Sequence, residues 1–438
     1  MNKIDSIAVR LRRLRIARHS GRVAAIRAGV IEVVGLNHAA SVGDRVLFPG
    51  RLAGEITGLS PDHAHVLPEG PAEGLSIGAQ AELAFAPLIA PADNWVGRIV
   101  DPFGQPLDGR PLAPGRDERP YRAPPPPAAS RKRLGMRLDT GLAVFDTLLP
   151  LVRGQRIGLF AGSGVGKSTL LSALAKGVSA DVVVIAMIGE RGRELREFVE
   201  STLGPEGMAR AIVVAATSDQ PPLIRRRCAW AAMTVAEHFR DTGRHVLFLA
   251  DSITRFAEAH REIALASGES PSHRGFPPST SQTIMALAER SGPGPEGAGD
   301  ITAIFSVLVA GSDMEEPVAD ILRGVLDGHV VLDRAIAERG RFPAIDVLRS
   351  VSRSLPHAAS AAENALIARA RAALGAYAES ELMIRAGLYS PGSDPKLDEA
   401  VKLYPALDAF VARNAEGSAQ SFRLLTEALS LRGSGVRG

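Results

Sequence analysis

The sequence predicts an α/β protein with three parts: a small all-β domain, a central domain built on a parallel sheet, and a helical C-terminal domain. Three observations carry this prediction. Short Val- and Ile-rich runs broken by Gly, Pro and Asp fill residues 21–90. Apolar strand-like runs alternate with helical patterns over residues 136–356, and residues 357–438 are rich in Ala, Leu, Glu and Arg.

The composition suits such a chain. Its 438 residues are 45% hydrophobic, which is enough for a large core and for two or three domains of roughly 100–200 residues each. The single cysteine, Cys228, excludes an intrachain disulfide and suits a reducing compartment. The sequence has neither an apolar run of about 18 residues nor a signal peptide, so we expect a cytoplasmic protein.

The positive charge is concentrated at the N-terminus. The chain has a net charge of +3, but residues 1–20 hold six basic residues and one acid, so the rest is close to neutral. Nucleic-acid-binding domains usually carry a basic stripe, and the near-neutral body therefore gives no support for a nucleic-acid partner. Ile4, Ile7, Leu11 and Leu14 share one face of a predicted amphipathic helix over residues 1–20. This helix is either a solvated tail or a docking element for a partner protein or an acidic membrane surface.

The all-β domain and a proline-rich connector follow. Residues 21–90 have turn residues at the spacing of a small barrel or sandwich. Residues 91–135 hold many prolines, and the run Pro124–Pro127 favours an extended, semi-rigid segment. The connector is either a domain boundary or a long strap over a surface.

The central domain, residues 136–356, contains the predicted parallel sheet. Helical patterns such as 168–176 and 228–240 separate near-continuous apolar strands, which is typical of a sheet covered on both faces. The predicted strands are 156–161, 181–189, 211–216, 245–251 and 303–310.

The stretch 161–169, AGSGVGKST, lies between a predicted strand and a predicted helix. Its glycines let successive backbone N–H groups point inward, where they and the helix N-terminus bind phosphate oxygens. Lys167 adds positive charge at the β- and γ-phosphates, and Ser168 offers a hydroxyl to Mg²⁺. The alternative is an ordinary strand–helix turn, since Ala161 stands where the strict pattern has glycine. The predicted nucleotide-binding residues of this loop are Gly162, Ser163, Gly164, Val165, Gly166, Lys167, Ser168 and Thr169.

Two carboxylates come at the ends of other predicted strands, at the edge where parallel sheets bind ligands. Asp251 ends the strand 245–251 and would orient Mg²⁺, although a helix N-cap is the alternative. Glu190 follows the strand 181–189 and can align or deprotonate an attacking water. Arg191 beside it can stabilise the γ-phosphate. For Glu190 and Arg191 the alternative is a surface ion pair.

These motifs together resemble one family. AGSGVGKST, GERGRE, ADSITRFA, RGFPPS, ADILRGVLDGHVVLDR, FPAIDVLRSVSR and LYSPGSDPKLDEAV are spread over about residues 20–433. They are similar to segments of the flagellar and type III secretion export ATPases, which are relatives of the catalytic subunits of rotary ATP synthases. The resemblance implies a RecA-like P-loop NTPase core with an N-terminal β-barrel and a C-terminal helical domain. It also implies a homohexameric ring that binds ATP and Mg²⁺ at its subunit interfaces.

The resemblance implies roles for single residues. Lys167 and Ser168 would bind phosphate and Mg²⁺, Glu190 would be the catalytic carboxylate, and Asp251 would lie near Mg²⁺. Two arginines would surround the phosphates, namely Arg191 and Arg255.

Two further residues match the family at the end of the central domain. Phe342 corresponds to an aromatic side chain that packs on the adenine, and plain core packing is the alternative. Arg353 is similar to an arginine that reaches across a subunit interface and offsets charge on the transferred phosphoryl group. The alternative for Arg353 is a structural salt bridge.

The function implied is ATP hydrolysis that energises or gates the export of flagellar proteins through a type III secretion apparatus. Residues 1–20 would dock a stalk-like regulator protein or contact the inner membrane. The ring would meet an export gate and chaperone–substrate complexes, in the cytoplasm at the flagellar base, peripheral to the inner membrane.

Three alternatives stay open on the sequence. An injectisome ATPase would share every catalytic motif, and genomic neighbours or the motility of a deletion strain would separate the two. A non-catalytic ring subunit is disfavoured by Glu190, because such subunits of the rotary family have glutamine at the matching position. A ring-shaped RNA translocase is disfavoured by the aromatic content of 5%, which offers few stacking platforms.

Overall fold

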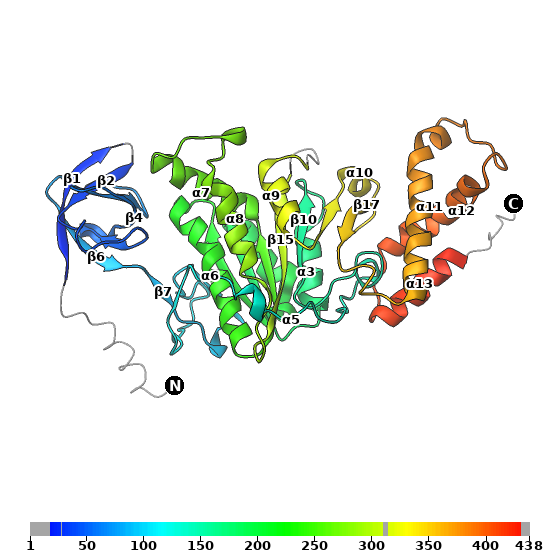
Figure 1. The fold of residues 1–438 in the computed structure, drawn as a ribbon, viewed down its shortest axis with the longest axis horizontal. Coiled ribbons are helices and arrows are strands. Elements are labelled where there is room, and N and C mark those ends of the chain that lie inside the picture. Colours follow the sequence, from blue (N-terminus) through cyan, green and yellow to red (C-terminus); the bar gives the residue numbers. More distant parts are fainter. Residues whose placement is uncertain (1–17, 28, 310–313, 431–438) are drawn as a thin grey trace.

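A computed structural model of the chain describes residues 18–27, 29–309 and 314–430. Figure 1 shows an elongated molecule with a β-barrel at one end, an α/β core in the middle and a helical domain at the other end. The predicted fold class is confirmed. The amphipathic helix predicted for residues 1–20 lies almost entirely outside the described residues, and Ser20 already begins the first strand.

The N-terminal domain is a closed antiparallel barrel with the strand order β1-β2-β5-β4-β3-β6. Alternate residues of these strands point inward, and Val23, Ile31, Val33, Ile56 and Val66 form much of its core. The strands are β1 (Ser20–Arg27), β2 (Val30–Val34), β3 (Arg45–Leu47), β4 (Ala53–Leu59), β5 (Ala64–Pro68) and β6 (Gln80–Phe85).

The proline-rich connector contributes to structure on both sides of it. β7 (Leu88–Ile89) pairs with β9 (Arg119–Pro120) in a small separate sheet. β8 (Arg98–Val100) joins the edge of the central sheet in parallel to β12 (Ala211–Thr217). The connector is therefore partly built into the core, which its composition did not indicate.

The central sheet has the strand order β17-β16-β10-β15-β13-β11-β12-β8, and β14 (Gly292–Pro293) pairs with β15. All neighbours from β16 to β8 are parallel, whereas the edge strand β17 is antiparallel to β16. The strands are β10 (Arg156–Ala161), β11 (Val182–Glu190), β12, β13 (His245–Asp251), β15 (Asp300–Leu308), β16 (Gly328–Leu332) and β17 (Ile345–Ser352). The five strands predicted from apolar runs are present, with small shifts at their ends.

Helices cover both faces of this sheet, as predicted. One face is packed by α6 (Pro222–Asp241), α7 (Ile253–Ala266), α8 (Ser279–Glu289) and α9 (Pro317–Val325). The other face is packed by α2 (Ala143–Asp146), α3 (Lys167–Gly177) and the segment that holds α4 (Gly192–Glu197) and α5 (Gly204–Met208). The short helix α10 (Arg334–Glu338) connects β16 and β17.

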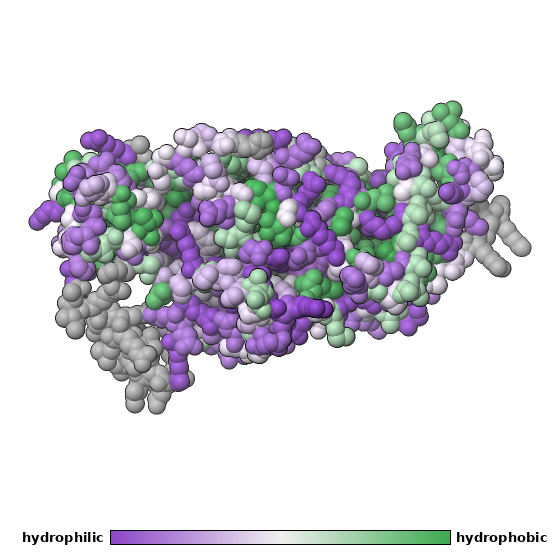
Figure 2. Space-filling model, viewed as in Figure 1, coloured by the Kyte–Doolittle hydropathy of each residue, from purple (hydrophilic) through white to green (hydrophobic). Residues whose placement is uncertain are grey.

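The C-terminal domain consists of α11 (Ala361–Arg385), α12 (Pro395–Val411) and α13 (Ser418–Ser430). A capping box of Ser360 and Glu363 begins α11. The central domain contacts the start of α13. The Asp139 carboxylate accepts hydrogen bonds from the backbone N–H and the hydroxyl of Ser418, at 2.8 and 2.5 Å. Figure 2 shows hydrophobic residues gathered at the tip of this domain. Leu382 near the end of α11 and Leu388 just after that helix are 82% and 73% exposed. Across the described ranges, none of the helices is both long and apolar enough to span a bilayer.

Candidate nucleotide site

An open cleft of about 1040 Å³ lies where the parallel strands β10, β11 and β15 end. Because parallel strands present their carboxyl ends at one edge of a sheet, residues far apart in the sequence meet there. Ten of the predicted site residues line this cleft: Gly162, Ser163, Gly164, Gly166, Lys167, Ser168, Thr169, Glu190, Arg191 and Arg255.

The glycine-rich loop has the backbone that phosphate binding requires. Gly164 and Gly166 have φ of +76° and +86°, in the left-handed region that glycine adopts without strain, and α3 begins at the next residue, Lys167. Val165 packs its side chain into the core and leaves only its backbone to the loop. Ala161 is the last residue of β10 and has no left-handed backbone, so an alanine costs little where the strict motif has glycine.

Lys167 and Asp251 form an ion pair at the floor of the cleft. Asp251 is 2% exposed and ends β13, and its Oδ1 atom also accepts a hydrogen bond from the Ser306 hydroxyl at 2.8 Å. Asp251 therefore lies beneath the loop, and the N-cap of α7 is the next residue, Ser252. The N-cap alternative for Asp251 is thus wrong.

Glu190, the last residue of β11, is half-buried at the same edge of the sheet. Burial and the nearby Asp251 carboxylate raise its pKa to about 7, and Lys167 opposes this shift. Within the described part of the chain, Glu190 makes no ion pair, and a hydrogen bond with Glu194 adds to the rise of its pKa. A carboxyl group with a pKa near neutrality is suited to proton transfer at physiological pH.

Arg191 and Arg255 pair with glutamates other than Glu190. Arg191 precedes α4, is exposed, and pairs with Glu194 at 2.9 Å, so the surface ion pair with Glu190 considered from the sequence is not formed. Arg255, in the first turn of α7, pairs with Glu258 at 2.9 Å. Both glutamates also line the cleft, so an incoming phosphate competes with them for the guanidinium groups.

Phe342 lies against the glycine-rich loop and is 50% exposed. A Cβ atom placed on Gly166 would come within 3.2 Å of the Phe342 ring, so the ring sits directly beside the start of α3. A residue this exposed is not packed in the core, and its ring can contact a flat aromatic group beside the loop.

Arg353 lies away from this cleft and does not line it. It follows β17, whose last residue, Ser352, pairs with Gly328 on β16, at the level of Ile157 on β10. Along β10, Ile157 lies four residues before Ala161, which is a distance of roughly 13 Å along the strand. In the sheet, β16 lies between β17 and β10. The Arg353 side chain is exposed, and its guanidinium donates to the Arg323 carbonyl oxygen at 3.2 Å.

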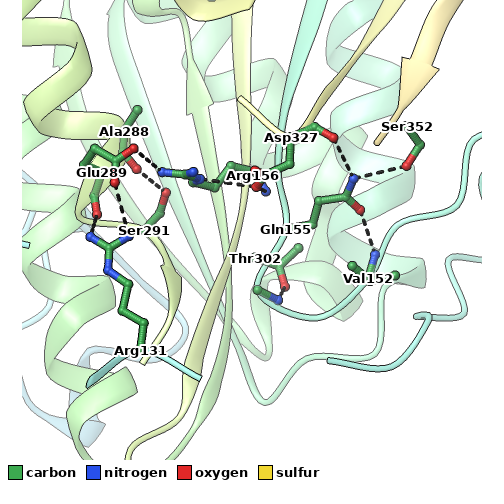
Figure 3. A network of polar contacts seen from close by, with 11 residues as sticks. Arg131, Val152, Gln155, Arg156, Ala288, Glu289, Ser291, Thr302, Asp327 and Ser352 are labelled. Atoms are coloured by element: carbon green, nitrogen blue, oxygen red, sulfur yellow. Dashed lines mark hydrogen bonds and ion pairs between the residues drawn. The ribbon is translucent and has the colours of Figure 1, made fainter. Parts of the chain in front are cut away.

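A polar network fixes the backbone before Arg353. Figure 3 shows Gln155 donating from Nε2 to the Asp327 carbonyl oxygen and to the Ser352 hydroxyl, both at 3.1 Å. The Arg353 N–H donates to the same Asp327 carbonyl at 3.0 Å. Gln155 is completely buried just before β10 begins, so β10 has the glycine-rich loop at one end and this network at the other. The salt bridge considered for Arg353 is not formed within the described residues.

The donor groups of the cleft fit Mg²⁺. Mg²⁺ is usually held by one or two carboxylates or hydroxyls together with substrate phosphates and water. Ser168 is exposed in the cleft and Asp251 lies behind Lys167, which provides this donor set. Among the residues that the structure describes, no cluster of three or more His, Cys, Asp or Glu forms a metal site without a nucleotide.

Several cleft residues were not predicted. Ser306 is one of two hydroxyl residues in the buried strand β15, the other being Thr302, so its position in the sequence did not single it out. Thr254 accepts from the Leu308 N–H at 2.8 Å and donates to the Leu308 carbonyl at 3.3 Å, which ties α7 to β15. The remaining lining residues not predicted are Gly189, Glu194, Ser218, Arg225, Glu258, Leu308, Val309 and Glu316.

Comparisons with known proteins identify the domain that contains this cleft. The ATP synthase alpha/beta family nucleotide-binding domain matches residues 141–352, and the T3SS EscN ATPase C-terminal domain matches residues 359–425. A flagellum-specific ATP synthase of Caulobacter vibrioides is 48% identical over 90% of this chain and 92% of its own. The SPI-2 type 3 secretion system ATPase of Salmonella typhimurium is 44% identical over 84% of each chain.

A solved structure shows the same architecture. The assembled ATPase EscN of enteropathogenic E. coli, in complex with its central stalk EscO, superimposes with a TM-score of 0.85 at 36% identity. The match covers 94% of this chain and all of EscN. The chain therefore belongs to the family of flagellum-specific ATP synthases and type III secretion ATPases, and it is an ATPase.

Proposed function

We propose that the chain hydrolyses Mg²⁺-bound ATP in this cleft, as part of a homohexameric ring that energises or gates flagellar protein export. One observation carries the catalytic part of the proposal. The glycine-rich loop, Lys167, Asp251 and the unpaired Glu190 lie together at one sheet edge, although they come from three strands.

The roles of the residues follow from their chemistry. The backbone N–H groups of Gly162–Gly166 and the start of α3 bind the phosphate oxygens, and Lys167 neutralises their charge. Glu190 orients the attacking water and holds its proton. Ser168 and Asp251 hold Mg²⁺, which supplies charge neutralisation at the phosphates when bound. Phe342 packs on the adenine, and Arg191 and Arg255 leave their glutamates to contact the phosphates.

The placement of Arg353 supports hydrolysis across a subunit interface. Its backbone is fixed at the opposite end of the strands from its own phosphate loop, and its side chain is exposed. Because Arg353 does not line its own cleft, we propose that it contributes to the site of a neighbouring subunit. Such an arginine contributes about 10³–10⁵ in rate in related phosphoryl-transfer enzymes. Gln155 and Ser352 act as positioning residues for it.

Flagellar export is favoured over injectisome secretion by the comparisons. The flagellar relative from Caulobacter is 48% identical over 90% of the chain, against 44% over 84% for the SPI-2 ATPase. Deletion of the gene tests this directly. We expect a non-motile strain without external flagellar filaments and with unchanged effector secretion, whereas a motile strain would favour the injectisome.

The partners proposed from the sequence extend this function. The stalk of EscN supports a stalk-like regulator protein for this chain, with residues 1–20 as its dock or as a contact with the inner membrane. An export gate and chaperone–substrate complexes complete the proposed set at the flagellar base. Removal of residues 1–17, which leaves β1 and the Arg18 contact with Glu82 intact, followed by partner pull-down and liposome binding, tests the role of the N-terminus.

Steady-state ATP hydrolysis tests the catalytic proposal. We expect the rate per subunit to rise with protein concentration, because each site is completed by a neighbour. A rate per subunit that stays constant from the dilute limit would contradict interface catalysis. Absence of hydrolysis at every concentration would favour a non-catalytic ring subunit, and stimulation by RNA would favour a translocase.

A further inference from the structure

A second cavity of about 340 Å³ lies beside the junction of barrel and core. It shares no lining residue with the nucleotide cleft. The connector contributes Arg122, α6 contributes Arg226 and Trp230, and α7 contributes His260. Its volume is within the range of small-molecule sites.

The charges at this junction do not balance. We define the junction cluster as Arg45, Arg122, Arg226, Arg227, Glu55 and Glu69. Glu55, on β4, pairs with three guanidinium groups of the cluster: Arg226 at 3.0 Å, Arg227 at 2.9 Å and Arg122 at 3.5 Å. Glu69 pairs with Arg227 at 2.6 Å and with Arg45 at 2.5 Å. Even with the nearby Asp101, four guanidinium groups face three carboxyl groups.

Arg226 bears most of this imbalance. It is 5% exposed, and its Nε atom is buried with no hydrogen-bond partner among the described residues. Burial lowers its pKa to about 10, with Glu55 opposing the shift and Arg122 and Arg227 increasing it. A buried charge without full compensation costs free energy, and a bound anion would remove that cost.

Stacking on one aromatic ring holds the Arg122 and Arg226 side chains in place. The guanidinium groups of Arg122 and Arg226 lie 4.2 and 4.8 Å from the Trp230 ring centroid. Both arginines therefore face the cavity from a rigid base, and Leu287 adds an apolar surface.

The rest of the lining carries no unpaired charge, and the His260 ring lies beside Arg226, with its Nδ1 atom 3.4 Å from the Arg226 Nη1 atom. Burial, and to a smaller extent Arg226, lowers the pKa of His260 to about 4, so this side chain is neutral at pH 7. Gln282 and Thr283 of α8 add an amide and a hydroxyl. Arg290 is neutralised by Glu237 at 2.6 Å, and Glu269 near His260 is held by the Ser279 N–H and hydroxyl.

We infer that this cavity binds a phosphate group, free in solution or carried by a small organic molecule, through Arg226 and Arg122. Guanidinium groups match phosphate oxygens in charge and geometry, and the hydroxyl and amide of Thr283 and Gln282 complete the polar lining. The bound anion stabilises the barrel on the core, because Arg226 also holds Glu55. This site is independent of the proposed roles of Glu190 and Arg353.

Thermal unfolding of the full chain tests the site. Inorganic phosphate and phenyl phosphate are each compared with chloride at equal ionic strength, with saturating Mg-ADP in the nucleotide cleft. We expect phosphate to raise the melting temperature of the wild type. Arg226→Gln loses this response, whereas Arg261→Gln keeps it, because Arg261 stacks on Phe276 at 4.9 Å and does not line the cavity. Equal responses in all three proteins would overturn the inference.

A second variant leaves Arg226 intact. Thr283→Asp places a carboxylate in the cavity, and we expect it to raise the melting temperature without phosphate and to weaken phosphate binding about tenfold or more. Thr283→Asn, its uncharged counterpart, keeps the phosphate response. Stabilisation by Thr283→Asp without any phosphate response in the wild type would overturn the inference in favour of a carboxylate from another protein chain. A stronger response to phenyl phosphate than to phosphate identifies an organic phosphate as the ligand, and equal responses identify free phosphate.

Discussion

The nucleotide cleft and the junction cluster both concentrate charge in partly buried surroundings, but their imbalances have opposite sign. In the cleft, Lys167, Arg191 and Arg255 pair with Asp251, Glu194 and Glu258, so the Glu190 carboxylate is left without a cation of its own. In the junction cluster, four guanidinium groups share two glutamates. Buried charges are normally paired, so an excess of either sign indicates what is missing. The cleft lacks a cation, which Mg²⁺ supplies with ATP, and the junction lacks an anion.

The largest expected effect is on turnover in the cleft. Glu190→Gln removes the unpaired carboxylate, and we expect ATP turnover to fall by about 10²–10⁴-fold with nucleotide binding retained. Glu197→Gln, which changes an exposed glutamate of α4 that does not line the cleft, is the control and keeps the activity. Near-normal turnover of Glu190→Gln would remove this residue from catalysis.

The same variant has a consequence for stability. The pKa of Glu190 in the folded protein, about 7, lies above its ordinary value of 4.5. The wild type therefore loses stability as pH rises through this range, whereas the glutamine variant does not. At pH 8 we expect Glu190→Gln to be more stable than the wild type by about 1–2 kcal/mol. This is less than the full pKa shift implies, because solvent in the open cleft screens the charge. Denaturant unfolding at pH 5 and pH 8 measures the difference.

The second effect concerns the junction cluster and is structural. Arg227→Met removes the cation that bridges Glu55 and Glu69, and we expect the free energy of unfolding to fall by about 3–5 kcal/mol. Arg334→Met breaks an exposed pair with Glu338 and serves as the control, with a loss below about 0.5 kcal/mol. Equal losses in the two variants would show that the junction cluster contributes no more than a surface pair.

The third effect is the pH dependence of the cleft. Because a raised pKa keeps Glu190 protonated in acid, we expect kcat/KM to fall about tenfold per pH unit below pH 7. Rates measured from pH 5.5 to 8.5 test this. A profile that is flat down to pH 5.5 would mean that Glu190 is ionised throughout and does not act as proposed.

The smallest effect concerns the second contact of Asp251. Ser306→Ala removes the hydroxyl that donates to Asp251, and we expect a loss of about 1 kcal/mol, or roughly fivefold in turnover. Ser267→Ala, which removes a helix-end hydroxyl bonded to Ile263, leaves turnover unchanged. If both variants behave alike, Ser306 has no part in holding Asp251.

The cleft was predictable because its residues carry local patterns. The loop 161–169 shows its glycines and lysine in one stretch, and Asp251 and Glu190 each end an apolar strand. Parallel topology then brings these strand ends together without further information. Ser306 lies inside a strand and acts only through its neighbour β13, so no local pattern reported its role.

The junction cluster and parts of the sheet were not predictable in this way. Arg226 and Arg227 both pair with Glu55, which lies 171 and 172 residues away in the sequence. These pairs form only where the barrel packs against the core. β8 has three residues within a proline-rich stretch, and β17 is a half-exposed edge strand with polar residues. Neither strand shows the continuous apolar run that indicated the buried strands.

The central claim is that each catalytic site combines Glu190 of one subunit with Arg353 of its neighbour. Mixing two inactive proteins, Glu190→Gln and Arg353→Ala, in equal amounts tests it most directly. In randomly mixed rings, one interface in about four joins an intact Glu190 to an intact Arg353, so we expect about a quarter of wild-type turnover to return. Mixtures as inactive as the separate variants, in rings shown to exchange subunits, would contradict the account.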